Sequence, residues 1–365
     1  MNTTLKFILY KLTLLLVISP YGLKYTYCGQ PEIFSETMIV ATQGAELKTG
    51  SGVLRQLNPG EVLVATQRNQ EWLWIPLQGG WIKAAELKSA EDLISVLDQF
   101  IETEPTAERY HLRGIAQQVL KNYPAALSDF AASLELKPEN APIYVNRGNI
   151  RRLQREYDLA LADLNHAIQL STKDANAYYI RGLIRLEQKQ LDSAVDDLTK
   201  AIQQEPHMVA ALNARGITHR ELNQFDQALQ DFNQAIKANN FVSEVFSNRA
   251  AIWEQQSEFE SAIKDYQRAL ELNPASAVAH NDIAWLYATC SDTKFQNPVL
   301  AVKHARKACE LPRFDDWNLL DTLATAYQAD QHLDKASHTL TQAIEKAPAE
   351  QKKVLKKKLD KIVNK

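Results

Sequence analysis

The sequence predicts a helical repeat protein with a small all-β domain in front of it, and three observations support this fold class. Glycine is scarce, with 12 residues in 365, and eight of the 12 lie within the first 80 residues. The last four, Gly114, Gly148, Gly182 and Gly216, are 34 residues apart. Short apolar runs between turn residues are confined to residues 37–88. Scarce glycine argues against a nucleotide-binding α/β enzyme, whose phosphate-binding turns need glycine, and favours helices.

Composition and charge narrow the function classes. A hydrophobic share of 45% with 23% charged residues is typical of folded soluble proteins, and a net charge of -3 gives no reason to expect nucleic acid as a partner. The charge is uneven, because residues 351–365 carry seven lysines and one aspartate. Three cysteines, Cys28, Cys290 and Cys309, form neither a disulfide framework nor a zinc motif. We therefore expect no metal and no cofactor.

Residues 1–28 predict a secretory signal peptide. Lys6 and Lys11 precede the apolar run 12–19, which is too short for a bilayer core that needs about 20 residues. We expect cleavage after Cys28 and an exported mature chain without a stable membrane span, in the periplasm or associated with the cell envelope. The alternative is an interfacial anchor that stays attached.

Residues 37–88 predict a compact meander of about five short strands, small enough to form one barrel. The apolar runs 62–65 and 72–75 lie between turn residues at 58–60, 69–70 and 78–80. The order of a polar strand, a Pro-Gly turn, a tryptophan-rich strand and a closing Gly-Trp-Ile resembles the bacterial Src-homology-3-like barrel. Members of that family bind cell-wall peptides or act as docking modules, so the resemblance implies one of these roles.

Three of the six tryptophans, Trp72, Trp74 and Trp81, lie within this domain. Trp72 and Trp74 share one face of a strand, so the three rings could form an exposed aromatic groove. The alternative is that they fill the barrel core or pack on the helices that follow. We favour this alternative, because so small a barrel needs large rings to exclude water.

The 34-residue period extends to other columns. The glycine column continues as Ala250 and Ala284. An alanine follows 12 residues after each of the first five column residues, and a large apolar residue follows four residues later. The alanines are Ala126, Ala160, Ala194, Ala228 and Ala262, and the large residues are Phe130, Leu164, Leu198, Phe232 and Tyr266. These spacings place the columns on one helical face, with small residues where a neighbouring helix comes close.

This pattern resembles the tetratricopeptide repeat over residues 107–350, which implies a right-handed superhelix of seven helix pairs. The expected repeats are 107–140, 141–174, 175–208, 209–242, 243–276, 277–316 and 317–350. In the sixth repeat the alanine comes five residues late, at Ala301. We expect the additional residues to lengthen a turn, with Asn297 as helix cap and Pro298 as the first helical residue.

Both ends of the stack need a cover. Residues 89–105 predict an N-terminal capping helix that begins with a capping box of Ser89 and Asp92. Residues 351–365 predict a basic C-terminal capping helix, because the lysines alternate with an apolar face. That face consists of Leu355, Leu359 and Ile362. The alternative function is a basic tail that binds acidic membranes or polyanions.

Arginine and aspartate recur together in the first five repeats. An arginine precedes each column residue and an aspartate precedes each large apolar residue, which predicts a ladder of ion pairs. The arginines are Arg113, Arg147, Arg181, Arg215 and Arg249, and the aspartates are Asp129, Asp163, Asp197, Asp231 and Asp265. The sixth and seventh repeats lack both, with Ile283 and Leu323 in place of arginine. The alternative is an arginine track for acidic ligands.

The family resemblance also implies a ligand surface on the concave inner wall, lined by the first helix of each repeat. The residues expected there are Asn149, Arg152, Tyr179, Asn213, Arg220 and Glu254. They are polar and of mixed charge, which suits an extended peptide. The carboxylate clamp of the family is not matched, because His111 and Ile115 occupy its places.

No nucleophile, metal or phosphate-binding motif occurs, so no catalytic residue is expected. The sequence thus predicts an exported, non-enzymatic scaffold that binds a protein or peptide. The alternative is a cell-wall (peptidoglycan) binding protein that acts through the tryptophans of the β domain.

Overall fold

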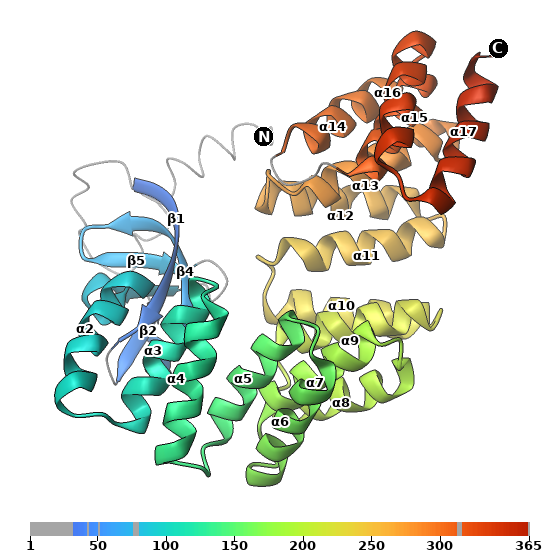
Figure 1. Ribbon diagram of the computed structural model, residues 1–365. Coiled ribbons are helices and arrows are strands. Elements are labelled where there is room, and N and C mark those ends of the chain that lie inside the picture. Colours follow the sequence, from blue (N-terminus) through green and yellow to red (C-terminus); the bar gives the residue numbers. More distant parts are fainter. Residues whose placement is uncertain (1–31, 42–43, 50–51, 76–79, 312–315, 364–365) are drawn as a thin grey trace. The chain divides into compact units, whose positions relative to one another are not determined.

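The computed structural model describes residues 32–41, 44–49, 52–75, 80–311 and 316–363. It divides into two compact units, with the boundary between Asp163 and Leu164. The predicted signal peptide, residues 1–28, lies outside the described residues. Helical repeats preceded by a small β domain are present, so the predicted fold class is confirmed (Figure 1).

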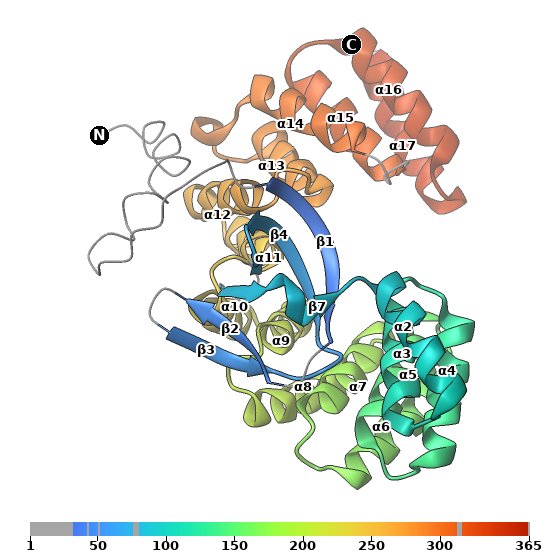
Figure 2. The ribbon, with the colours of Figure 1, turned by 90° about the vertical axis from the view of Figure 1, so that its left-hand side faces the viewer.

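The N-terminal domain is an antiparallel sheet of seven described strands, where the sequence predicted about five. They are β1 (Glu32–Val40), β2 (Ala45–Thr49), β3 (Gly52–Leu57), β4 (Val62–Asn69), β5 (Trp72–Ile75), β6 (Gly80–Lys83) and β7 (Leu87–Lys88), with a 3-10 turn, η1 (Ala84–Glu86), before β7. Their order is β3-β2-β6-β5-β4-β1-β7. Figure 2 shows the long, curved β1 beside β4, with which it pairs. In the described strands no backbone pairing joins the two edges, β3 and β7.

The core of this sheet is aliphatic. Leu73 and Ile75 of β5 and Ile82 of β6 are fully buried against Leu47 of β2. Trp72, Trp74 and Trp81 alternate with these residues along the strands and stay partly exposed. Because successive side chains of a strand point to opposite faces, burying the aliphatic residues places the rings on the other face. The expectation that the tryptophans fill the core is therefore wrong.

The first unit continues with helices that form repeat pairs behind a capping helix. They are α2 (Ala90–Thr103), α3 (Ala107–Val119), α4 (Tyr123–Leu136), α5 (Ala141–Leu153) and α6 (Tyr157–Leu170), within which the unit boundary falls. Ser89 Oγ accepts a hydrogen bond from the backbone N–H of Asp92 at 3.1 Å, which confirms the predicted cap. Leu93, Leu97 and Ile101 of α2 pack into one core with the first repeat.

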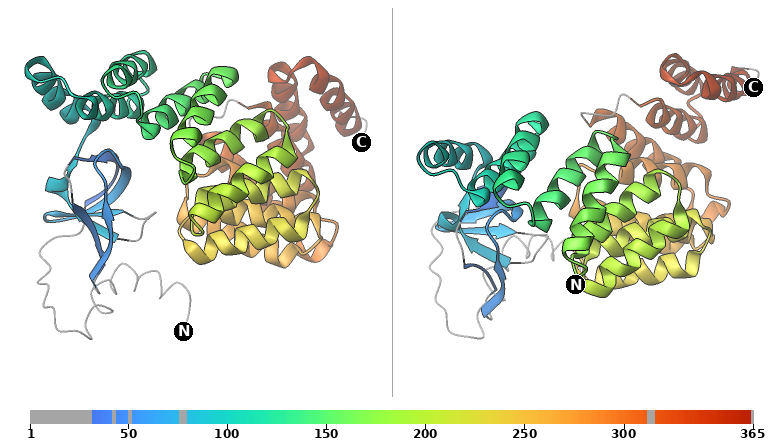
Figure 3. Two further views of the ribbon diagram at one scale, coloured as in Figure 1. Left: turned by 90° about the horizontal axis from the view of Figure 1, so that it is seen from below. Right: turned by 60° about the horizontal axis from the view of Figure 1, so that its bottom comes forward.

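The second unit consists of further helix pairs (Figure 3). They are α7 (Ala175–Glu187), α8 (Leu191–Gln204), α9 (Val209–Glu221), α10 (Phe225–Ala238), α11 (Ser243–Gln255), α12 (Phe259–Leu272), α13 (Ala277–Thr289), α14 (Pro298–Glu310), α15 (Trp317–Ala329) and α16 (Leu333–Lys346), followed by α17 (Ala349–Val363). The first helices of successive pairs contact one another more closely than the second helices do. The first helices therefore form the inner, concave layer of this unit.

The glycine column lies where the two helices of a pair touch. A Cβ atom on Gly114, Gly182 or Gly216 would come within 2.5 to 2.8 Å of the side chain of the large apolar residue in the second helix. Such distances are far shorter than van der Waals contact. The predicted role of the column, close helix contact, is confirmed for these three residues.

The turn inside each of the first five pairs has a feature that the sequence did not predict. Lys121, Arg155, Lys189, Asn223 and Ser257, again 34 residues apart, adopt left-handed backbone angles with φ between 57 and 63°. The backbone N–H of the next residue donates to a carbonyl five residues earlier, as in Asn122 to Gln117 at 2.9 Å. This is the Schellman motif, built here without the glycine that usually occupies the left-handed position.

The two predicted irregularities in the second unit are present. Asn297 Oδ1 accepts from the backbone N–H of Leu300 at 3.0 Å, and Pro298 is the first residue of α14. The additional residues form a short 3-10 helix, η2 (Thr293–Phe295). In α17, Leu355 and Ile362 are buried against the last helix pair, with Leu359 partly buried beside them. Among the described residues no helix is both long and apolar enough to cross a bilayer.

Candidate protein-binding surface

The predicted Arg–Asp ladder is confirmed in all five repeats. In each, Nε and one terminal nitrogen of the arginine donate to the two carboxylate oxygens, at 2.6 to 3.0 Å. The aspartate side chains are at most 10% exposed and the arginine side chains 13 to 22%. The hydrogen bond that Arg113 donates to Asp129 raises the pKa of Arg113, and the bond to Asp163 does the same for Arg147. These guanidinium groups are held by the fold, which argues against an arginine track for ligands.

The ladder also joins successive repeats. In four repeats the remaining guanidinium nitrogen donates to a side chain on the helix that precedes the arginine's own pair. The acceptors are Asp98 for Arg113, Asn165 for Arg181, Thr199 for Arg215 and Asn233 for Arg249, at 2.6 to 3.0 Å. These acceptors could not be predicted from the sequence, because they differ in residue type. Three of them nevertheless share one spacing, 16 residues before the arginine. Each of these four arginines thus fixes both its own helix pair and the stacking of that pair.

In the sixth repeat a histidine pair replaces the ion pair. His304 stands at the aspartate position, and its Nδ1 lies 2.8 Å from Nδ1 of His280. His280 Nε2 lies 3.2 Å from the carbonyl oxygen of Pro274, which can only accept, so His280 carries its proton on Nε2. His304 must then donate from Nδ1 to His280. The hydrogen bond therefore requires His280 to be neutral, whereas His304 donates from Nδ1 in either charge state.

Burial lowers the pKa of both rings, and that of His304 falls to about 4. The positive charges of Lys303 and Lys307 lower the pKa of His280 further, and His280 and Lys303 do so for His304. A folded-state pKa below the ordinary value of 6.5 means that the unfolded chain binds more protons as the pH falls. The pair therefore stabilises the fold above pH 6.5 and loses this contribution between pH 6.5 and about 4.

We expect the melting temperature to drop less between pH 7 and pH 5 in His304→Gln than in the unchanged chain. Each kcal/mol of lost stability corresponds to about 2 to 4 °C. Asp282, whose pKa is raised to about 6, contributes with the opposite sign in the same range, but it is present in both proteins and cancels in the comparison. Calorimetry at both pH values measures the difference, and equal drops would contradict the role of the pair.

The predicted inner-wall residues lie on the first helices of both units. In the first unit, Nε and a terminal nitrogen of Arg152 lie 3.3 and 3.4 Å from Asn149 Oδ1. In the second unit, Tyr179 is on α7, Asn213 and Arg220 are on α9, and Glu254 is on α11. All of them are partly exposed.

Side chains of neighbouring first helices meet in the second unit. Asn248 Nδ2 of α11 donates to Asn213 Oδ1 of α9 at 2.9 Å. Glu254 Oε2 accepts a hydrogen bond from the hydroxyl group of buried Tyr266 at 3.2 Å. The positive charge of Arg220 acts on Asp282 of α13, whose negative charge in turn acts on Glu254. We call Arg220, Glu254 and Asp282 the inner-wall charge cluster.

The carboxyl groups of this cluster are hard to ionise. Burial raises the pKa of Asp282 to about 6, although the hydrogen bond from Asn281 and the charge of Arg220 oppose the shift. Burial also raises the pKa of Glu254, and Asp282 adds to the effect. Asn281 Oδ1, next to Asp282 in the chain, is buried and has no hydrogen-bond partner within the described residues. An acceptor beside the cluster is thus left unsatisfied in that part of the chain.

The tryptophans of the sheet form a second surface. The ring centroids of Trp74 and Trp81 are 5.3 Å apart with a tilt of 52°. Lys48 and Lys83 place their ammonium groups 5.8 and 5.6 Å from the ring of Trp72. An aromatic face flanked by cations is thus presented on the side of β5 and β6 opposite the core.

Comparison with known proteins decides the nature of the repeats. Residues 111–175, 175–207, 209–241 and 243–276 match family models described as tetratricopeptide repeat. These residues form tetratricopeptide repeats. Proteins built from this repeat are generally scaffolds for protein–protein interaction. No curated protein sequence matches the chain.

Solved structures with tetratricopeptide repeats share the fold at low sequence identity. The complex of Cut9 and Hcn1 from the APC/C is 17% identical with a TM-score of 0.58, and the match covers 65% of this chain and 46% of that one. Yeast Tom70 is 18% identical with a TM-score of 0.52, covering 75% and 59%. A tetratricopeptide repeat protein from Parabacteroides merdae is 18% identical with a TM-score of 0.50, covering 76% and 99%. The chain spans less than half the length of the first of these proteins.

The terminal helix adds a residue to the inner layer of the last two helix pairs. Lys358 of α17 contacts Asp321 and bonds Thr325 Oγ1 at 2.7 Å, and its ammonium group lies 5.7 Å from the ring centroid of Trp285. Sequence reasoning missed Asp282, Trp285 and Asp321. Their signal was available, since each stands on a first helix at a position equivalent to, or next to, a predicted one.

The described residues contain no group of three or more histidine, cysteine, aspartate or glutamate side chains arranged to hold a metal ion. Cys290 and Cys309 are free thiols, and burial raises the pKa of both, that of Cys309 to about 11. A thiol with a raised pKa is a poor nucleophile at neutral pH.

Proposed function

We propose that the chain is an exported, non-enzymatic scaffold that binds a protein or peptide on the inner layer of its tetratricopeptide repeats. The observation that carries this proposal is the inner-wall charge cluster beside the Asn213–Asn248 pair. These side chains come from consecutive first helices and are partly exposed, so an extended segment lying across the helices would meet them in succession.

The electrostatics favour a partner that brings hydrogen-bond donors. Asp282 and Glu254 have raised pKa values because burial has removed water that a charged carboxylate needs. Backbone N–H groups or a cationic side chain of a bound segment would replace that water. Among the described residues, the buried Asn281 Oδ1 is a further acceptor without a partner.

Export belongs to the same proposal. It rests on residues 1–28, where lysines precede a short apolar run. A mature chain outside the cytoplasm would meet partners in the periplasm or the cell envelope. Edman sequencing of the chain purified from its native cell tests this step, with a mature N-terminus at Gly29 as the expected result.

A second candidate function is binding to peptidoglycan. The observation in its favour is the partly exposed pair Trp74 and Trp81 with Trp72 beside it, since aromatic faces suit the apolar faces of sugars and peptides. The resemblance of residues 37–88 to the bacterial Src-homology-3-like barrel is part of this candidate. In it, the tetratricopeptide repeats serve as a spacer.

Photo-crosslinking in the native cell separates the two candidates. We expect p-benzoylphenylalanine in place of Tyr179 to crosslink to a partner protein, and the double substitution Asn213→Ala with Arg220→Gln to reduce the crosslink at least tenfold. The same reagent in place of exposed Phe241, in the turn after α10, is the matched control and should not capture that protein.

Other outcomes of these experiments would contradict the first proposal. If the crosslink at 179 is absent, or unchanged by the double substitution, the inner layer is not the binding surface. If, in addition, the full chain sediments with purified peptidoglycan and Trp74→Ala with Trp81→Ala abolishes this, the cell-wall function replaces the first proposal.

A further inference from the structure

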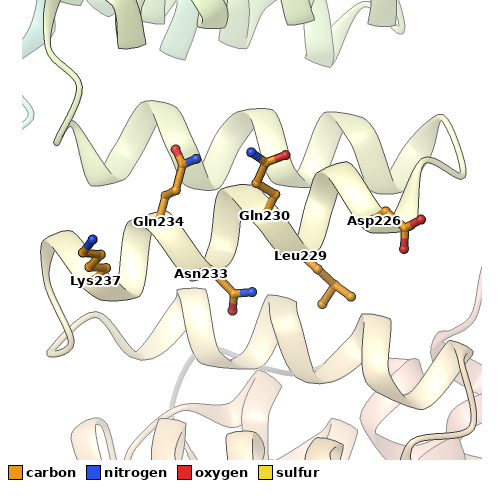
Figure 4. Close-up of a pocket in the computed structure, with 6 residues that line it drawn as sticks. All are labelled: Asp226, Leu229, Gln230, Asn233, Gln234 and Lys237. Atoms are coloured by element: carbon orange, nitrogen blue, oxygen red, sulfur yellow. The ribbon is translucent and has the colours of Figure 1, made fainter.

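Two pockets of similar size occur at equivalent places on two second helices. The first, about 450 Å³, is lined by six residues of α10, which Figure 4 shows projecting from successive turns of that helix: Asp226, Leu229, Gln230, Asn233, Gln234 and Lys237. The second, about 440 Å³, is lined by Val299, Val302, Lys303, Arg306, Lys307 and Glu310 of α14, together with His280 and His304. Counted from the column alanines Ala228 and Ala301, the six helical positions are the same.

The two pockets differ in charge. The α10 pocket has one acidic and one basic side chain, whereas the α14 pocket has three cations and a single acid, Glu310. The first of the six positions is acidic in five of the seven second helices, as Asp158, Asp192, Asp226, Glu260 and Asp334. On α14 this position is Val299, which is 67% exposed.

Helix α12 shows what the missing acid does. There Glu260 pairs with Lys264 at 2.8 Å, and Arg268 pairs with Glu271 at 2.9 Å. Lys264 and Arg268 occupy the positions of Lys303 and Lys307 on α14. On α14, no ion pair within the described part of the chain involves Lys303, Arg306 or Lys307. The α14 pocket is therefore a concentration of uncompensated positive charge.

This positive charge lowers the pKa of the two histidines in the pocket, and the histidines add no charge of their own. Lys303 and Lys307 lower the pKa of His280, and Lys303 lowers that of His304. Both rings are consequently neutral at pH 7. The three cations are exposed and lie beside these two neutral rings, which add no positive charge to the pocket.

We propose that the α14 pocket binds an acidic peptide segment of a partner protein. Carboxylates of the segment meet Lys303, Arg306 and Lys307, and an aliphatic side chain covers exposed Val299 beside partly buried Val302. Arg306 makes the contact with a carboxylate directional, because its guanidinium group can bind the carboxylate through two parallel hydrogen bonds.

The length of the pocket and the negative charge of Glu310 favour a short acidic peptide over a longer polyanion. From Val299 to Glu310 the helix rises about 16 Å, the length of roughly five extended residues. Glu310 closes one end of the pocket and repels a polyanion that continues beyond it, such as a nucleic-acid strand. Apolar walls between the cations likewise suit alternating acidic and aliphatic side chains better than a chain of phosphates.

Fluorescence anisotropy with the full chain tests the proposal. The probe is a labelled, amidated peptide Glu-Leu-Glu-Glu-Leu-Glu, and we expect saturable binding that weakens as salt is raised. The combination Lys303→Gln, Arg306→Gln and Lys307→Gln should lower the affinity at least tenfold. Lys264→Gln with Arg268→Gln removes charge from the equivalent positions of α12 and is the matched control, with less than a twofold effect expected.

A further variant tests the pocket by adding a negative charge instead of removing positive ones. Val299→Glu supplies the acid that Glu260 supplies on α12, so it should neutralise Lys303 and weaken peptide binding about fivefold. It also places an acid in the first turn of a helix, which is favourable for folding. Absence of binding, or equal affinity in the α12 and α14 variants, overturns the proposal. So does equally tight, α14-dependent binding of a six-nucleotide single strand, which would assign the pocket to polyanions in general.

Discussion

Replacing Arg249 by methionine is expected to lower the free energy of unfolding by about 3 to 5 kcal/mol, as for removal of one partner from a buried ion pair. Arg249 donates to both carboxylate oxygens of Asp265, at 2.7 Å each, and to Asn233 at 2.6 Å. No other ion pair of Asp265 exists within the described residues. The substitution therefore leaves a largely buried carboxylate without compensation.

Arg181→Met is the matched comparison, because Asp197 has two arginine partners. Arg185 lies 2.8 Å from the second oxygen of Asp197 and remains after the substitution. We expect Arg181→Met to cost less than Arg249→Met, although Asp197 is fully buried. Equal losses would show that the second arginine gives no compensation.

The double substitution Arg249→Met with Asp265→Leu tests the ladder itself. Removing both charges avoids the unpaired carboxylate, so the double variant should be more stable than Arg249→Met alone. Urea denaturation followed by circular dichroism gives the three free energies. A coupling energy near zero would mean that the hydrogen bonds seen here contribute nothing to stability.

The ladder illustrates which parts of the fold the sequence predicts. Arg249 and Asp265 repeat an arrangement found in four other repeats. Because the two residue types recur together at a constant spacing, the sequence alone predicts their contact. Asn233 was missed because its counterparts are Asn165 and Thr199, so the column shares a position but not a residue type. The left-handed turn residues were missed for the same reason, since Lys189 and Ser257 carry no chemical sign of their conformation.

The candidate surfaces were predicted less completely than the repeats. The tryptophans were placed in the right domain, but the interpretation that they fill the core is wrong, because aliphatic residues such as Leu73 suffice to fill it. The inner-wall charge cluster combines Arg220, Glu254 and Asp282 from three repeats, and its pKa shifts arise from burial that no single repeat reveals. The unusual charge of the α14 pocket is evident only in comparison with the same six positions of the other second helices.

A leucine at position 182 is expected to destabilise the chain by about 1 to 3 kcal/mol, the usual cost of overpacking. A Cβ atom on Gly182 would lie 2.8 Å from Cγ of Leu198, which is fully buried in the second helix of the same repeat. Neither side chain can move away, because both helices are held by their neighbours. An unchanged melting temperature for Gly182→Leu would contradict the close contact of the two helices.

The same leucine should have the opposite effect when Leu198 is absent. Leu198→Ala alone is expected to cost about 2 to 5 kcal/mol, because it leaves a cavity in the core. In that background the nearest remaining neighbour of a Cβ at 182 is the carbonyl oxygen of Ala194 at 3.5 Å, an ordinary contact. A leucine at 182 would then fill the cavity and also gain about 1 kcal/mol of helix propensity over glycine. Thermal unfolding of the four proteins tests this reversal of sign, which follows only if residues 182 and 198 compete for one space.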